Sequence, residues 1–223
     1  MCTTLWPRRK ETSSSRFVKM KARKGIIKEL HSLLQDIAGL TDNQCTILEI
    51  LGEENLKKTV KFLVEVKPNS GAYQGGKFDF LFKVSHRYPI IAPEVLCLTQ
   101  IYHPNIDDCG EICLSLFEDW APEYNTLHDC VHGLLFLFNH PNLEDPLSPY
   151  FCPEDANDAE MFLKNVRKSL EGGSVEGFKF PRNLPGTSDN DKSTQHGGIA
   201  EFGSSEPKEY PKLKASHPLP DLL

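Results

Sequence analysis

The sequence predicts an α+β fold: an N-terminal helix, a four-stranded antiparallel meander sheet, a long irregular segment and C-terminal helices. Three observations predict it. Apolar residues recur at helical spacing near the N-terminus, four short strand-like segments follow, and loop residues separate the last of these from two more helical segments. Of the 223 residues, 39% are hydrophobic. That content supports one core of about 150 residues.

The first helix is expected from about Arg16 to Gly39, where the glycine is a helix-ending signal. Its apolar face repeats every three or four residues. The residues of this face are Ile26, Ile27, Leu30, Leu33, Leu34 and Ile37.

Four strands are expected next, and the Gly- and Pro-containing loops between them favour antiparallel hairpins. The third alternates apolar and polar residues, which is typical of a strand with one buried face. The expected strands are Thr46–Leu51, Thr59–Lys67, Lys77–Val84 and Glu94–Thr99.

Two helices are expected after residues 100–125. One runs from about Leu127 to Phe138, and Thr126 with Asp129 forms an imperfect capping box at its start. The other runs from about Glu154 to Leu170. Beyond Pro181 the chain is rich in Gly, Pro, Ser, Asp and Lys, which predicts a disordered tail.

The charge distribution is uneven. Residues 1–30 contain nine Lys or Arg against two Glu, although the whole chain carries −6. This indicates a basic arm with an acidic or carbonyl-rich partner, or a solvated tail. No reader motif accompanies the arm, so nucleic acid is not expected. The longest apolar run, Leu134–Phe138, is too short to span a membrane, and the first ten residues contain no apolar stretch that resembles a secretory signal. We therefore expect a soluble protein of the cytoplasm and nucleus, without membrane contact.

The seven cysteines are irregularly spaced, and a disulfide framework is not expected in such a chain. Three interpretations apply to the segment 101–116. His103, Cys109 and Cys113 could form a metal knuckle, but their spacing does not fit one and no metal site is expected. The cysteines could fill space in a packed loop. Alternatively Cys113 is a nucleophile, and exchange with an incoming thioester needs little beyond orientation and an oxyanion donor such as Asn105.

The residues around this segment resemble the ubiquitin-conjugating enzyme family. His103-Pro104-Asn105 is followed by Cys113 ten residues after the histidine, and then by Trp120-Ala121-Pro122. Tyr88-Pro89 with Pro93 is similar to the family's YPxxPP turn, and the segment 142–147 to its PNPxDPL element. The resemblance covers about residues 22–180 and implies the ubiquitin-conjugating fold. One departure is that Trp120 lies seven residues after Cys113, where the family commonly has eight.

The resemblance implies a transferase. Cys113 would accept a ubiquitin-like modifier as a thioester from an activating enzyme and pass it to a substrate lysine. Asn105 would order the loop and stabilise the oxyanion, and Asp145 would orient the amine. His103 and Pro104 would be structural. No cofactor is implied, because the upstream activating enzyme uses the ATP.

Partner contacts are also implied. The family presents two loops to activating enzymes and to RING-type ligases, and here these hold Ile90, Pro122 and Glu123. The chain is most similar to the neddylation conjugating enzymes, whose N-terminal extension docks on the activating enzyme and a co-ligase. By this resemblance residues 1–22 would be that extension, with Leu5 and Trp6 as apolar anchors. The expected organisation is a flexible extension at 1–22, a catalytic core at 23–180 and a tail at 181–223.

Alternatives remain at this point. A ubiquitin-specific conjugating enzyme would carry the same motifs, because the activating enzyme selects the modifier. A non-catalytic binding module of the same fold is the other alternative. The presence of Cys113, Asn105 and Asp145 together argues against it.

Overall fold

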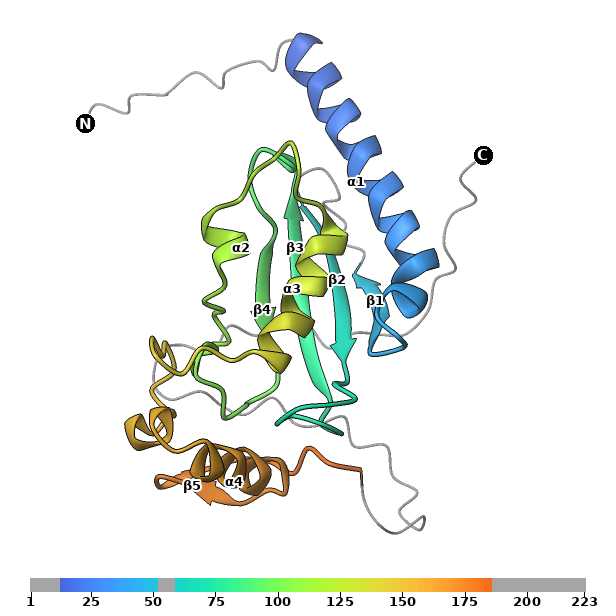
Figure 1. Ribbon diagram of the computed structural model, residues 1–223. Helices are drawn as coiled ribbons and strands as arrows, with labels where there is room; N and C mark the ends of the chain where they lie inside the picture. Colours follow the sequence, from blue (N-terminus) through green and yellow to red (C-terminus); the bar gives the residue numbers. More distant parts are fainter. Residues whose placement is uncertain (1–12, 52–58, 186–223) are drawn as a thin grey trace, which may run out of the picture.

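The centre of the molecule is a four-stranded antiparallel sheet. The computed structural model describes residues 13–51 and 59–185. Its strands are β1 (Cys45–Leu51), β2 (Thr59–Val66), β3 (Phe78–Ser85) and β4 (Glu94–Cys97), which pair in chain order. The predicted meander is therefore confirmed, with strand ends within two residues of those expected (Figure 1).

The alternation in β3 directs four side chains into the core. Phe78, Phe80, Phe82 and Val84 are all completely buried. Opposite them on β2, Phe62 pairs with Phe82 in the strand register, and the two rings stack with centroids 4.8 Å apart. Cross-strand aromatic pairs of this kind stabilise sheets and fix their register.

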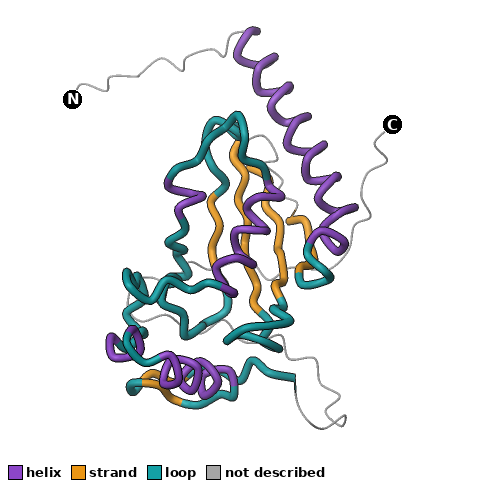
Figure 2. Tube along the Cα trace, viewed as in Figure 1, coloured by secondary structure: helices purple, strands orange, loops and turns teal. Residues whose placement is uncertain are grey.

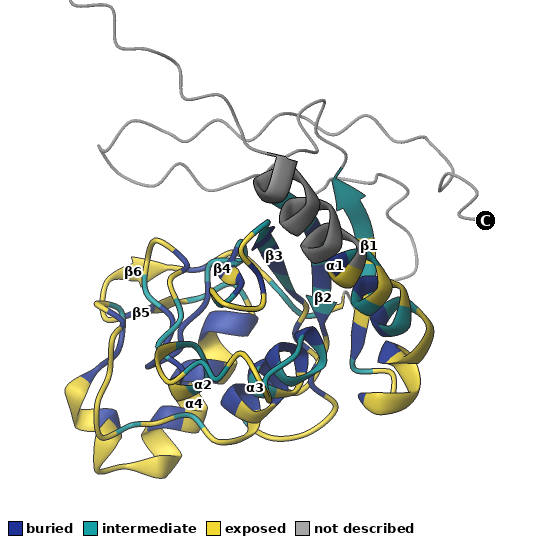
Figure 3. Cartoon of the chain, turned by 90° about the horizontal axis from the view of Figure 1, so that it is seen from above, coloured by how far each residue is buried: buried dark blue, intermediate teal, exposed yellow. Residues whose placement is uncertain are grey.

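Helix α3 (Leu127–Asn139) packs on this apolar face. The ring of Phe138 stacks on Phe78 at 4.7 Å and meets Phe80 edge-on at 6.0 Å. The predicted capping box at its start is present: the Thr126 hydroxyl accepts from the Asp129 N–H, and the Asp129 carboxylate accepts from the Thr126 N–H. Figure 3 shows the buried stretches of β2, β3 and α3.

Helix α1 (Ser13–Leu40) runs along β1 and α3 (Figure 1). Gly39 does not end it as expected. The helix continues to Leu40, the Thr41 hydroxyl donates to the Ile37 carbonyl oxygen, and the left-handed turn is made by Asp42 and Asn43 at φ 50° and 58°. Short side chains that bond locally tolerate this conformation.

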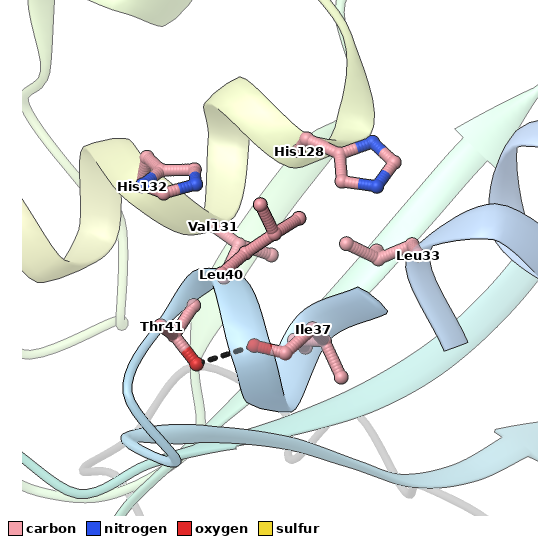
Figure 4. Close-up of a pocket in the computed structure, with 7 residues that line it drawn as sticks. All are labelled: Leu33, Ile37, Leu40, Thr41, His128, Val131 and His132. Atoms are coloured by element: carbon pink, nitrogen blue, oxygen red, sulfur yellow. Dashed lines mark hydrogen bonds between the residues drawn. The ribbon is translucent and has the colours of Figure 1, made fainter. Parts of the chain in front are cut away.

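The junction of α1 and α3 is closely packed. Leu33 and Ile37 of α1 meet Val131 of α3 there, with His128 and His132 at the rim (Figure 4). The small pocket that these residues line is too tight to hold a water molecule. The contact therefore joins the helices and does not form a ligand site.

The elements after β4 differ from expectation in three ways. The single helix expected over 154–170 is two elements, the 3₁₀ turn η1 (Pro153–Ala156) and α4 (Ala159–Leu170). The chain breaks there because the Asp158 side chain caps α4 by accepting from the Met161 N–H. A short helix, α2 (Ser115–Glu118), and the hairpin strands β5 (Ser174–Val175) and β6 (Phe178–Lys179) were not expected.

The expected domain boundaries differ from the structure at two points. Residues 181–185, expected in the disordered tail, pack on the core, because the Asn183 N–H donates to the Leu170 carbonyl oxygen and the Asn183 side chain accepts from the Lys77 N–H. The division at residue 22 falls inside α1, so residues 13–22 continue the first helix of the core. Leu5 and Trp6, and the tail from residue 186 on, lie outside the described residues. Where the chain is described, no helix has both the length and the apolar character needed to cross a membrane.

Candidate active site

The irregular segment after β4 is anchored by a buried imidazole. Figure 2 shows this segment as loop on either side of α2. The His103 side chain is fully buried and stacks on Tyr73 with ring centroids 5.0 Å apart. Its Nδ1 accepts from the Asn105 N–H at 3.0 Å, which leaves Nε2 as the donor to the Leu137 carbonyl oxygen at 3.3 Å.

Burial lowers the pKa of His103 from 6.5 to about 3. The ring is therefore neutral, and both nitrogens are occupied. A neutral, fully bonded imidazole neither takes the proton of Cys113 nor ligates a metal. The geometry thus gives His103 a structural part in the loop.

Asn105 ties this loop to the segment that follows α3. Its Oδ1 accepts from the Asn142 N–H at 2.8 Å, and its Nδ2 donates to the carbonyl oxygens of Asn142 at 3.0 Å and Asp145 at 3.5 Å. The neighbouring Pro104 carbonyl oxygen accepts from the N–H groups of Leu147 and Ser148. The structure thus holds Asp145, which is itself exposed, between two anchored points beside the loop of Cys113.

Cys113 lies at the end of a tight turn. Asp107 organises the turn: its carboxylate accepts from the N–H groups of Cys109 and Glu111. Gly110 closes the turn at φ 80°, and a Cβ at that position would lie 2.0 Å from the Cys97 carbonyl oxygen, so only glycine fits. The Cys113 N–H then donates to the Asn105 carbonyl oxygen at 3.0 Å, which fixes the cysteine against the anchored loop.

The sulfur of Cys113 is half-buried and lies in an acidic environment. Its thiol donates to Glu118 Oε1 at 3.5 Å. Partial burial, the Glu118 carboxylate and the charge of Asp145 all raise the pKa of the thiol. The sequence did not single out Glu118, and no spacing rule would have done so, because α2 was not expected.

Six of the seven cysteines lie in the described residues, and all six are free. Four are buried and fill space in the fold, as expected. Cys109 is exposed, and its sulfur lies within 4.8 Å of ligand atoms of Asp107 and Asp108. Asp107 already accepts two backbone hydrogen bonds with one of its oxygens, so this cluster is explained by the turn.

Two exposed loops lie together beside the active-site segment. The Trp120 indole N–H donates to the Pro89 carbonyl oxygen at 2.6 Å and joins the loop of Tyr88-Pro89 to the loop before α3. Ile90 is 73% exposed, and Pro122 and Glu123 are also exposed. Tyr124, which sequence reasoning missed, is 79% exposed beside them.

Glu29 of α1 links the two loops through hydrogen bonds on the side that faces α1. Its carboxylate accepts from the Tyr88 hydroxyl at 2.7 Å and from the N–H of Leu127, the first residue of α3, at 2.6 Å. A carboxylate is favoured at a helix N-terminus. Glu29 lies three residues after Ile26 and four before Leu33, and an acid within an apolar stripe is the sequence signal that could have found it.

Removal of the Tyr88 hydroxyl is expected to weaken the link that Glu29 makes between Tyr88 and the start of α3, which we call the Glu29 clamp. Tyr88→Phe keeps the ring but leaves the Glu29 carboxylate with one donor fewer, and a hydrogen bond to a charged group contributes about 1.5–3 kcal/mol. We expect the free energy of unfolding in urea to fall by about that amount. Tyr124→Phe, at an exposed ring, is the matched control and should leave it unchanged. Equal stability of Tyr88→Phe and wild type would contradict the clamp.

Known proteins share this arrangement. A family model described as ubiquitin-conjugating enzyme matches residues 32–170. The chain belongs to the ubiquitin-conjugating enzyme family. The expected family and fold are thereby confirmed, and as a member of the family the chain is a transferase that carries its modifier through a cysteine thioester.

Individual relatives within the ubiquitin-conjugating family are also similar. A protein from Arabidopsis thaliana named NEDD8-conjugating enzyme Ubc12 is 40% identical over 152 residues, which are 67% of this chain and 80% of the relative. The Drosophila melanogaster protein named Nedd8-conjugating enzyme UbcE2M is 42% identical over 117 residues, covering 52% of this chain and 64% of the relative. The solved structure of Saccharomyces cerevisiae Ubc12 superimposes with a TM-score of 0.57 at 28% identity, covering 77% of this chain and all of that one.

Proposed function

We propose that this chain is a NEDD8-conjugating enzyme whose acceptor residue is Cys113. The observation that carries the assignment of the residue is the position of its sulfur. It is half-buried and reachable, and its backbone is fixed against Asn105, which in turn holds the loop of Asp145. The names of the similar proteins support the choice of modifier.

The charging step needs no dedicated general base. The activating enzyme delivers the C-terminal glycine of the modifier already as a thioester, and exchange between two thiols is close to balanced. The sulfur of Cys113, whose thiol pKa is raised, attacks the thioester carbonyl carbon, and the bond to the activating enzyme's sulfur breaks. The proton of Cys113 goes to that departing sulfur, so that one thiol is consumed and one is released. The chain needs no cofactor of its own for this step.

Transfer to lysine uses the surroundings of the sulfur. Asp145 is exposed and close enough to Cys113 for its charge to act on the thiol, so it is well placed to orient the amine of a lysine. Asn105 holds the loops in register and is proposed to stabilise the oxyanion once the intermediate forms. His103 and Pro104 keep their structural parts.

The proposed partners follow the exposed surfaces. The loops with Ile90, Pro122 and Glu123 would receive the activating enzyme and a RING-type ligase. The apolar residues Leu5 and Trp6 of the basic extension would dock on the activating enzyme and on a co-ligase. Free thiols are stable in the reducing cytoplasm and nucleus, where we propose that the enzyme acts on substrate lysines.

A charging panel tests the proposal. The purified chain is incubated with ATP and, in separate reactions, with matched pairs of modifier and activating enzyme: NEDD8, ubiquitin, and a further ubiquitin-like modifier. We expect a thiol-sensitive adduct that forms fastest with the NEDD8 pair. Preferential charging by the ubiquitin pair would replace the proposal with a ubiquitin-specific enzyme, and no adduct with any pair would indicate a non-catalytic binding module.

A further inference from the structure

Glu118 is held at the reacting sulfur by a segment that is fixed at both ends. At one end the Cys113 N–H is bonded to the Asn105 carbonyl oxygen. At the other end the Trp120 indole is bonded to the Pro89 carbonyl oxygen. Between them the chain forms the single turn α2, which the Asp119 N–H closes on the Ser115 carbonyl oxygen.

The length of this segment determines which residue faces the sulfur. Glu118 is the last residue of α2 and follows Cys113 by five positions, and its Oε1 lies 3.5 Å from Sγ. The segment is also one residue shorter than the pattern that the family resemblance led us to expect. The contact therefore depends on the single-turn connection between Cys113 and Glu118.

Two charged groups act on the sulfur among the described residues: Glu118 from α2 and Asp145 from the loop after α3. Asp145 is expected to orient the amine. Glu118 differs from it because it makes a direct hydrogen bond with the thiol. A carboxylate that accepts a hydrogen bond from the thiol is also close enough to return a proton to the sulfur when it departs as a thiolate.

We propose that Glu118 is a catalytic residue of the lysine-transfer step, in which it takes a proton from the attacking amine and gives it to the departing sulfur of Cys113. The proposal rests on the proposed function of Cys113 as the acceptor. It adds a second acidic residue with a task different from that of Asp145.

The step balances without another reactant. The lysine enters as a neutral amine, and its nitrogen attacks the thioester carbonyl carbon, so that the C–N bond forms and the C–S bond breaks. The proton released from the nitrogen goes to the Glu118 carboxylate and from there to Sγ. The products are the isopeptide bond, the free thiol and the regenerated carboxylate, and the hydrogen bond seen here is the state after transfer.

The first test needs no partner protein. The rate of Cys113 alkylation by iodoacetamide is measured as a function of pH in a Cys2→Ser/Cys109→Ser background, which removes Cys2, outside the described residues, and the exposed Cys109. Glu118→Gln keeps an oxygen acceptor but removes the charge, so we expect the alkylation profile to move to lower pH with faster alkylation at neutral pH. Asp119→Asn, which removes the same charge one residue later, is the matched control and should leave the profile in place.

The second test measures the transfer itself. The isolated thioester is mixed with free lysine, and its loss is followed in a single turnover, with whichever modifier the charging panel identifies. Glu118→Gln is expected to slow discharge by about 10²-fold, the lower end of what general acid–base catalysis contributes. Glu118→Asp, which keeps a carboxylate, should restore part of the rate, and Asp119→Asn should discharge like wild type.

The outcomes separate the two proposals. Wild-type discharge rates in Glu118→Gln would overturn the role of Glu118, because a merely structural contact survives in that variant. An unshifted alkylation profile would also overturn it. Charging by a modifier other than NEDD8 would refute the choice of modifier alone, since both tests of Glu118 can still be read.

Discussion

Cys113→Ser is expected to abolish the thiol-sensitive adduct and to replace it with a slowly formed, thiol-resistant one. The serine oxygen occupies nearly the same place beside Asn105 and Glu118, so the modifier can still be accepted as an ester. A hydroxyl is a much weaker nucleophile than a thiol, and exchange from a thioester to an oxygen ester is slower. Electrophoresis of the charging reaction with and without reducing agent measures both effects.

Cys109 provides the matched control for this experiment. It is exposed, lies four residues before Cys113, and is the other accessible cysteine among the described residues. Its pKa is raised by partial burial and by neighbouring acids, as that of Cys113 is. Cys109→Ser should charge normally. An adduct that persists in Cys113→Ala and disappears in Cys109→Ala would overturn the assignment of the acceptor.

Asn105→Ala is expected to slow transfer to lysine far more than charging. An amine that attacks a thioester builds negative charge on the carbonyl oxygen, and loss of one oxyanion donor typically costs about 10²–10³ in rate. Thiol exchange builds less of this charge and should be affected less. Single-turnover discharge and initial charging rates give the two numbers to compare.

The hydrogen bonds of Asn105 offer a second explanation for slow transfer in Asn105→Ala, namely loss of structure in the loops that they hold. In the resting enzyme the Asn105 amide is fully engaged with the backbone of Asn142 and Asp145, so its removal also loosens the loop of Asp145. Asn105→Asp keeps the oxygen that accepts from the Asn142 N–H but lacks the donor. If the donor acts on the oxyanion, both variants lose discharge. If Asn105 acts only by holding the loop, discharge and charging should fall together with the melting temperature.

The sequence alone predicted those elements whose signal lies within a few neighbouring residues. The alternation of Phe78, Phe80 and Phe82 depends on a strand geometry that neighbouring residues impose, and the structure buries all three. The capping box of Thr126 and Asp129 spans three residues and is present as expected. Cys113 was found because the spacing of several motifs matched a family pattern, which composition alone does not provide.

Contacts across long sequence separations were not predictable in the same way. Glu29 reaches the N–H of Leu127, 98 residues later, and only the packing of α1 on α3 brings them together. Glu118 meets the sulfur of Cys113 because a short connection folds into one helical turn. The break before α4 depends on whether Asp158 caps a helix or continues one, and local propensity does not decide between these.

The burial of His103 anchors the active-site loop on a side chain whose charge does not change near neutral pH. Because the imidazole stays neutral down to about pH 3, the ionisation of His103 does not contribute to a pH–rate profile above that pH. The same burial makes the fold sensitive to acid. Between about pH 6.5 and pH 3, His103 is protonated in the unfolded chain but neutral in the folded chain. The free energy of unfolding therefore declines as the pH falls through that window.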